Sequence, residues 1–250
     1  VERIREKGNV HQHLDLIAGL PYEDYDSFRK SFNDVYALKP EQLQLGFLKV
    51  LKGSHMQEMC GEYGIVHKEQ EPYEVLFTRW VDYGDVLKLK TVENMVEVYY
   101  NSGQFKKTLE YAERFFEDAF SIYERLGQFY VEKGYGDVSH SRMRRYEILL
   151  EFLETIPGIS REEAADRMVM DLYLRENLKS RPGFASDQKA YEKSVWDFRK
   201  KENVAKNAHV EVFGDKKAVL FDYNHRDPLT NNAYVEDVTE QVFEKAQSLV

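Results

Sequence analysis

The chain of 250 residues contains a single cysteine, Cys60. One thiol excludes an internal disulfide and does not by itself supply a cysteine-based zinc site. Scarce cysteine is typical of a reducing compartment, so a cytoplasmic location is predicted. The sequence also lacks any run of about 18 apolar residues and any signal-peptide pattern, so neither a membrane-spanning helix nor a membrane partner is predicted.

Positive charge is scarce as well. The formal net charge is −9 at pH 7 and the isoelectric point is near 5.4. General nucleic-acid binders usually present a basic face, so this balance argues against a nucleic-acid partner. Aromatic residues are abundant instead, because 17 Tyr and 15 Phe recur within charged segments. That pattern favours packed helices over disorder.

Residues 10–54 predict a parallel βαβ unit. An extended segment at 10–18 ends at Gly19-Leu20-Pro21, helical spacing of apolar residues covers 24–38, and a second strand-like run covers 42–51. A strand, a crossover helix and a second strand in this order are typical of parallel pairing. Ligands of parallel sheets bind at the carboxyl ends of the strands, which here are residues 19–23 and 49–55.

Polar residues occupy one face of each predicted strand. Because side chains alternate along a strand, His11, His13 and Asp15 share one face of the first strand, and Gln44 lies on a similar face of the second. Such faces suit either the ligand-bearing interior of a barrel or the solvated end of a sheet. Their repetition on neighbouring strands favours the interior site. The candidates for contact with a substrate are His11, His13, Gln44 and Lys49.

The rest of the sequence is mostly helical in its spacing. A short apolar piece at 73–80 opens this part, and a capping box at Ser160 to Glu163 marks one helix start. The expected hairpin joins 208–213 to 218–223 and is followed by a polar loop at 224–232. Helices are expected at 1–7, 55–64, 82–100, 105–133, 141–155, 160–177 and 186–203, and at the end of 234–249.

Several of these segments resemble a known enzyme family. Asp-Leu-Ile-Ala-Gly-Leu-Pro-Tyr-Glu at 15–23 resembles the "D-x-I-x-G-L-P-x-E" strand of radical S-adenosylmethionine (SAM) enzymes. The segment Gln44 to Ser54 resembles the next strand, which ends in a Gly-Ser turn. Together with Pro-Tyr-Glu-Val-Leu at 72–76 and Tyr-Tyr-Asn-Ser-Gly at 99–103, it is similar to a cobalamin-binding subgroup with a helical C-terminal domain of unknown function.

The resemblance implies a domain organisation and a chemistry. Residues 1–56 would be the end of a partial (β/α) barrel, 57–72 a connector, and 73–250 a mostly helical domain. The fold class is then α/β to mostly α. The full-length parent would use SAM, a [4Fe–4S] cluster and possibly cobalamin for a radical methylation or rearrangement of an unknown small-molecule or macromolecular substrate. The residues placed at the SAM wall are Asp15, Ile17, Gly19 and Pro21.

The single cysteine limits this expectation. A [4Fe–4S] cluster of this family needs three cysteines, so the chain is expected to hold no cofactor and to be inert in isolation. It opens with Val1 in what reads as the end of a helix, so a fragment is predicted, whose partners are upstream domains of the same protein. The alternative is a non-catalytic, helix-rich interaction module.

Smaller features carry two interpretations each. Asp24 or Asp26 can cap the helix that follows the first strand. Glu23 either caps that helix or belongs to the site, and the cap is favoured. His11 and His13 form a metal pair only if a third ligand joins them. The run from Asp222 to Asp227 holds several catalytic residue types, but a surface loop is the default interpretation.

Overall fold

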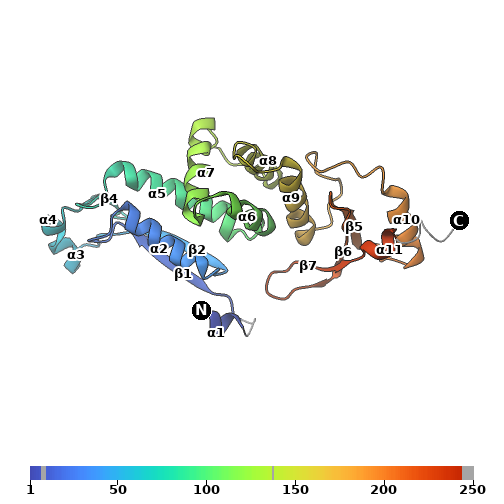
Figure 1. Ribbon diagram of the computed structural model, residues 1–250. Coiled ribbons are helices and arrows are strands. Elements are labelled where there is room, and N and C mark those ends of the chain that lie inside the picture. Colours follow the sequence, from blue (N-terminus) through green and yellow to red (C-terminus); the bar gives the residue numbers. More distant parts are fainter. Residues whose placement is uncertain (7–9, 137, 244–250) are drawn as a thin grey trace. The chain divides into compact units, whose positions relative to one another are not determined.

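The computed structural model describes residues 1–6, 10–136 and 138–243 (Figure 1). Helices make up 46% and strands 16% of the structure, so the predicted α/β to mostly α class is confirmed. None of the described helices is long and apolar enough to cross a membrane. The chain forms two compact units, and they are described separately. Unit 1 comprises 1–103 and 116–139, and unit 2 comprises 104–115 and 140–250.

These units group residues differently from the three predicted segments. The predicted boundaries at residues 56 and 72 both fall inside unit 1, and the chain enters unit 2, leaves it and returns. The two units are defined by contacts within the folded chain, whereas the three predicted segments are defined by resemblance to a family. The division into 1–56, 57–72 and 73–250 therefore stays a prediction.

The predicted βαβ unit forms in unit 1. β1 (His13–Ala18) and β2 (Gln42–Phe47) are parallel, with α2 (Tyr25–Ala37) as the crossover that lies along them in Figure 1. Asp24 begins the helix, since its side chain accepts a hydrogen bond from the Ser27 amide at 2.8 Å and Ser27 Oγ accepts one from the Asp24 amide. A short helix, α1 (Glu2–Arg5), precedes β1, while residue 7, the predicted end of that helix, lies outside the described residues.

The segment after β2 corrects two expectations. The helix expected at 55–64 is two single turns, α3 (His55–Glu58) and α4 (Cys60–Tyr63). The piece at 73–80, expected within the helical part, contains β4 (Val75–Phe77), which pairs antiparallel with β3 (Val66–His67). Residues 73–75 also bond to the chain just after β2, through Val50 N to Tyr73 O and Val75 N to Leu48 O, both 2.9 Å. Pairing with distant backbone decided this conformation.

The outer edge of β2 is closed by a side chain as well. Asn101 Oδ1 accepts from the Leu43 amide at 2.9 Å, and Asn101 Nδ2 donates to the Leu43 carbonyl at 3.0 Å. The side-chain amide thus occupies the position of a neighbouring strand at this residue. Asn101 ends η1 (Val96–Asn101), a π-helical turn that continues α5 (Tyr83–Met95) where an ordinary helix was expected.

Aromatic side chains form much of the unit 1 core. α7 (Ala119–Lys133) packs on α2, with Phe32 centred 5.4 Å from Phe120 and 5.9 Å from Tyr123. α7 also lies close against α5, because a Cβ placed on Gly127 would be 2.8 Å from Thr91 Oγ1. The abundant Tyr and Phe therefore serve helix packing in unit 1, as predicted.

The helix expected at 105–133 is interrupted. α6 (Lys106–Ala112) ends in a 3₁₀ turn, η2 (Glu113–Phe115), and α7 starts anew at its cap, Asp118. Asp118 accepts from the Ser121 amide at 2.8 Å and from Arg29 Nε at 2.9 Å. The apolar spacing is continuous through 105–133 and therefore did not predict this break. The break falls where the chain passes from unit 2, which contains α6, to unit 1, which contains α7.

Unit 2 contains a three-stranded antiparallel sheet between helices. β5 (Ala208–Val212) and β6 (Ala218–Arg226) form the predicted hairpin, and β6 continues three residues into the loop expected at 224–232. β7 (Ala233–Asp237), a strand that the sequence did not predict, extends the sheet. α9 (Arg161–Arg175) packs on one face, and α10 (Glu192–Lys201) with α11 (Thr239–Phe243) on the other (Figure 1). α8 (Arg142–Leu153) packs on α9. Residues 186–191, expected to be helical, precede α10.

A buried carboxylate caps α6. Asp171 on α9 is 3% exposed and accepts from the amides of Lys107 and Thr108 at 2.8 and 2.9 Å, and from Thr108 Oγ1 at 2.8 Å. Burial raises the pKa of Asp171 to about 7, although these three hydrogen bonds oppose the rise. Asp171 thereby ties α9 to the start of α6 within unit 2.

The pKa of Asp171 predicts a pH dependence of stability. In the unfolded chain this carboxyl loses its proton near pH 4, and in the folded chain near pH 7. The folded state therefore binds more protons between about pH 4 and pH 7, so its contribution to the free energy of unfolding falls as pH rises through that window and is constant above it. Asp171→Asn should remove this slope and destabilise unit 2 by about 1–3 kcal/mol.

Urea titrations from pH 4 to pH 8 measure both effects. Asp197→Asn, at an exposed position on α10, is the matched control and should keep the slope. An unchanged slope in Asp171→Asn would contradict the assignment.

Candidate functional site

The polar strand face predicted from the sequence exists and is open. Parallel register pairs His13 with Gln42, Asp15 with Gln44 and Ile17 with Gly46, and paired residues of neighbouring strands point to the same side. His13, Asp15, Ile17 and Gln44 are all exposed, whereas the alternate residues of β2 are buried: Leu43, Leu45 and Phe47. The structure thus brings these four predicted site residues together.

The two histidines contact each other just before and within β1. His11 Nδ1 lies 3.0 Å from His13 Nε2, and the rings meet edge to face with centroids 5.1 Å apart. A metal site would need a third ligand, and the described residues contain no group of three His, Cys, Asp or Glu able to hold an ion. Within that part of the chain, the pair is a hydrogen-bonding element of the face.

The structure gives a reason for glycine at position 19 that is separate from the predicted contact with SAM. Its φ is +86°, in the region that favours glycine, and a Cβ at this position would be 2.9 Å from Val75 Cγ1 on β4. The turn after β1 therefore closes directly onto β4. Cofactor contact at Gly19 stays a prediction, but the close approach observed here is to a side chain of the chain itself.

The turn that follows corrects the interpretation of Glu23. Asp24, not Glu23, caps α2, because only Asp24 reaches the Ser27 amide. Glu23 instead accepts from Ser31 Oγ at 3.3 Å, and partial burial raises its pKa. Pro21 is half-buried at the start of this turn, and Tyr22 adopts a φ of +68°, which is uncommon for a residue with a side chain. The turn therefore carries a strained, exposed tyrosine.

Lys49 lies beyond the end of β2. Its side chain is exposed, and its backbone forms an isolated antiparallel bridge with Glu74. Glu74 is already engaged by Lys90 and lies 3.8 Å from Lys68. The exposed Lys49 side chain lies at the carboxyl end of the sheet. The strand register does not place it on the face that carries Gln44.

Three of the motifs behind the family resemblance meet around β2. Val75, from segment 72–76, fills the space beside Gly19, and Asn101, from segment 99–103, closes the β2 edge. These roles could not be derived from the sequence, since each joins residues more than 50 positions apart. The structure adds that segments 72–76 and 99–103 both contact the β1–β2 pair or the turn that follows it.

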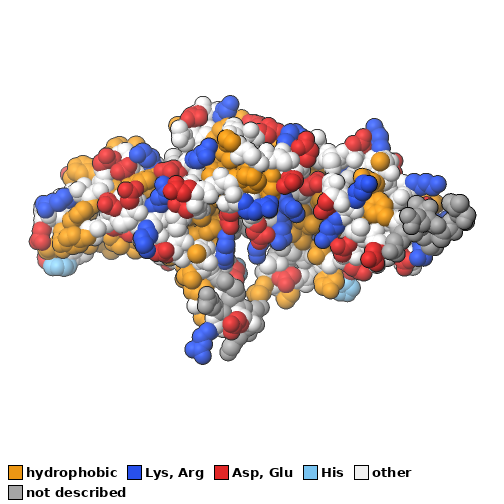
Figure 2. Space-filling view, in the orientation of Figure 1, with side chains coloured by type: hydrophobic (Ala, Val, Ile, Leu, Met, Phe, Trp, Pro, Cys, Tyr) orange, Lys and Arg blue, Asp and Glu red, His pale blue; other side chains and the backbone are white. Residues whose placement is uncertain are grey.

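An aromatic patch beside the turn was missed. The ring of Tyr22 lies 4.7 Å from that of Trp80 and 5.7 Å from that of Tyr63, and Tyr22 is 71% exposed. Val66 and Phe77, which pair across β3 and β4, are also exposed. Figure 2 shows hydrophobic side chains on this part of unit 1. No signal in the sequence joins residues 22, 63 and 80.

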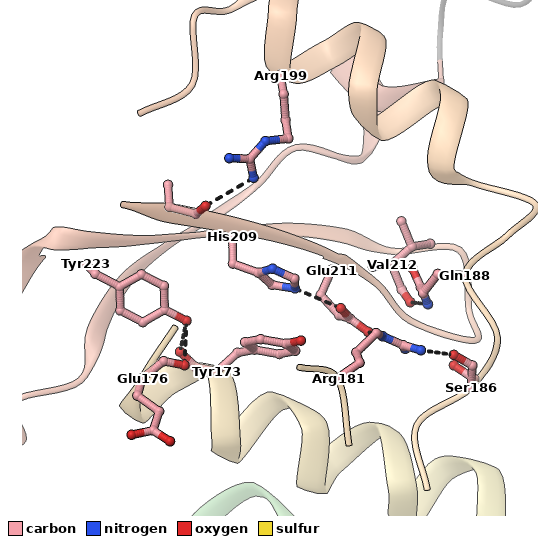
Figure 3. A network of polar contacts seen from close by, with 11 residues as sticks. Tyr173, Glu176, Arg181, Ser186, Gln188, Arg199, His209, Glu211, Val212 and Tyr223 are labelled. Carbon is pink, nitrogen blue, oxygen red and sulfur yellow. Dashed lines mark hydrogen bonds and ion pairs between the residues drawn. The ribbon is translucent and has the colours of Figure 1, made fainter. Parts of the chain in front are cut away.

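Unit 2 holds a buried charge network (Figure 3). Glu211 on β5 is 2% exposed, and Arg181 binds its Oε1 through Nε at 3.0 Å and through Nη2 at 2.5 Å. His209 Nε2 lies 2.8 Å from Glu211 Oε2, and the His209 ring stacks on Tyr173 with centroids 3.8 Å apart. Burial raises the pKa of Tyr173 to about 12. Both oxygens of the buried Glu211 carboxylate therefore have partners within the protein.

This network fastens the segment between α9 and α10 to the sheet. Arg181 also donates to the Ser186 carbonyl, and the Gln188 side chain exchanges two hydrogen bonds with the backbone of Val212. Tyr223 Oη donates to the Tyr173 carbonyl at 2.6 Å. Because the contacts run from a segment without regular structure to the sheet, we assign the network a structural role.

Gly19 yields a prediction on stability. Gly19→Ala adds both a left-handed backbone cost, about 1–2 kcal/mol, and a clash with Val75. Gly53 has a similar φ of +75° but open space around its Cβ position, so Gly53→Ala isolates the backbone cost. Urea unfolding should show a clearly larger loss for Gly19→Ala. Equal losses of unfolding free energy in the two variants would contradict the clash, because Val75 would then move aside without destabilising the protein.

Arg181 yields a second prediction. Arg181→Met leaves the Glu211 carboxylate buried without its cation, which typically costs about 3–5 kcal/mol. Arg161→Met breaks an exposed pair with Glu154 and should cost less than about 1 kcal/mol. Arg181→Met combined with Glu211→Gln should recover part of the loss. Equal stability of the two single variants would contradict the role assigned to the network.

The comparison with known proteins identifies a family. Residues 61–249 match the family described as "Protein of unknown function (DUF4080)". The βαβ unit and its polar face precede the match. A search of the curated proteins finds none that matches the chain. Since the match covers most of the 250 residues, the chain belongs to this family of proteins of unknown function.

Proposed function

We propose that the chain is the C-terminal part of a radical SAM enzyme of the cobalamin-binding subgroup. β1 and β2 would be the last strands of its partial barrel, and residues 73–250 its helical C-terminal domain. In the intact protein, bound SAM and its cluster would supply the radical chemistry for a methylation or rearrangement of a substrate that the residues do not specify. The chain's own contribution would be one wall of the site.

One observation carries the proposal: the two edges of the β1–β2 pair differ. The β2 edge is closed by Asn101 and by residues 73–75. Among the described residues β1 pairs only with β2, so its other edge is open. Natural proteins seldom leave an edge strand uncovered, and parallel strands normally belong to larger sheets with both faces covered. A further strand beside β1 would meet this need and extend the polar face.

The residues fit SAM in part and do not fit the cluster. Asp15 and Ile17 lie exposed on the shared face, where a carboxylate and an apolar side chain suit a ribose and an adenine. The chain has only Cys60 for a cluster that needs cysteine thiolates, and burial raises the pKa of that thiol, which disfavours the ligating thiolate. The proposal therefore assigns the cluster to residues outside this chain.

A second function is favoured by the aromatic patch. Tyr22, Val66 and Phe77 expose apolar surface next to the sheet, as expected of a helix-rich module that binds another protein. This interaction module would need neither cluster nor SAM. The two functions can therefore be distinguished, because only the radical SAM enzyme requires cluster-binding cysteines outside this chain.

The reading frame that encodes the chain tests the proposal. A radical SAM enzyme requires C-x₃-C-x₂-C encoded ahead of Val1, followed by enough residues for the earlier strands. We expect this motif to be present. Its absence would overturn the proposal and leave the interaction module.

Activity of the full-length protein tests the site. Ile17→Asp places a carboxylate where an adenine is expected, so anaerobic SAM cleavage, followed as 5′-deoxyadenosine, should fall at least about tenfold in kcat/KM for SAM. Leu87→Asp on α5, at a similarly exposed apolar position, is the matched control and should leave cleavage unchanged. Unchanged cleavage in Ile17→Asp would remove the β1 face from the SAM wall.

A further inference from the structure

A cavity of about 760 Å³ lies within unit 2, next to the sheet. It is bounded by the end of α10 at Phe198, by residues 202–205 and by Gln241 of α11. Its sheet side is formed by Leu220 and Asp222 of β6 and by Glu236 of β7. All of these residues belong to one compact unit, so the cavity does not depend on how the two units are placed.

The cavity exists because two helices cover only part of one sheet face. α10 and α11 bury Val210, Val212 and Ala218 on this face. Further along β6, Leu220 pairs with Glu236 and Asp222 pairs with Tyr234, and these pairs point to the same side. Tyr234 is 67% exposed. The uncovered half of the face is therefore an apolar floor with carboxylates at one side.

Asp222, Glu236 and Glu202 line the cavity, and Arg199 adjoins it at the Ala208 carbonyl. Asp222 and Glu236 are diagonal neighbours in the antiparallel register, and such neighbours are typically about 7–8 Å apart. No Lys or Arg is among the described residues that line the cavity. Glu202 at the rim pairs with Lys201 at 3.0 Å, whereas Glu236 forms no ion pair with a described residue. The negative potential is thus centred on Asp222 and Glu236.

His225 holds one of these carboxylates in place. Its Nδ1 lies 2.6 Å from Asp222 Oδ2, and this hydrogen bond lowers the pKa of Asp222. The backbone N–H and the side-chain Nδ2 of Asn224 donate to the other oxygen at 2.9 and 3.0 Å. The residues at 222–227 therefore do not form a plain surface loop: residues 222–226 belong to β6, and Asp222 and His225 line the cavity.

We propose that this cavity binds a primary ammonium group carried on an apolar chain of several carbons. The ammonium lies between Asp222 and Glu236, and the chain lies along Leu220, Val204 and Phe198. Two separated carboxylates suit a compact ammonium, whereas a guanidinium is best matched by one carboxylate in a bidentate pair. The apolar floor selects against small, fully hydrated cations. A free alkylamine and a lysine side chain share this chemistry.

Titration of the chain with n-hexylamine tests the proposal. Amide shifts of β6 and β7, followed by ¹H–¹⁵N NMR, should move with hexylamine and not with n-hexanol, which matches its length without the charge. Glu236→Gln should weaken hexylamine binding at least about tenfold, since one of two carboxylates is lost. Because Glu236 is exposed and lacks an ion-pair partner among the described residues, this variant should fold normally. Asp222→Asn should have a similar effect.

Asp197→Asn is the matched control, because it removes the same charge from α10 at a residue that does not line the cavity. Hexylamine affinity equal in Glu236→Gln and the original chain, or equal shifts with hexanol, would overturn the proposal. The peptides acetyl-Gly-Lys-Gly-amide and acetyl-Gly-norleucine-Gly-amide separate the two sources. Tighter binding of the lysine peptide than of hexylamine assigns the site to a protein side chain, and weaker binding assigns it to a free amine.

Discussion

Backbone groups along the edge of a strand need partners, and in unit 1 this requirement falls unequally on β1 and β2. The β2 edge is closed by a side-chain amide from residue 101 and by backbone from residues 73–75. These contacts draw η1 and β4 onto the sheet, and β4 then limits the turn after β1 to glycine. Much of the arrangement of unit 1 follows from closing the β2 edge, while no described strand pairs with the other edge of β1.

Unit 2 meets a different requirement with buried charge. Asp171 and Glu211 are both almost fully buried, and each is surrounded by donors: three from the start of α6 in one case, and Arg181 with His209 in the other. Both join elements that are far apart in the sequence. Buried carboxyl groups of this kind hold segments together, because separating the segments would leave a buried polar group without its partners. The family to which residues 61–249 belong includes all of this unit's sheet.

The two proposals concern separate parts of the chain and stand independently. One rests on the open edge and polar face of β1, and the other on a half-covered sheet face with two carboxylates. In both, a sheet is left incomplete by the elements that pack on it. The polar groups of both candidate sites lie on parts of a sheet that no helix or further strand covers among the described residues, and the sheet holds them in a fixed arrangement.

The sequence by itself determined the local elements whose signals lie within a few residues. The βαβ order, the strand alternation that groups His13 with Asp15, the helix caps at Asp24 and Ser160, and the 208–223 hairpin all follow from short-range spacing. The tertiary structure decided what depended on distant partners. β4 and β7 are strands because other strands are beside them, and the helix expected at 105–133 breaks where its halves belong to different units. Gly19 was noticed for its turn, but its need for glycine comes from Val75, 56 residues later, and no local pattern records a contact of that range.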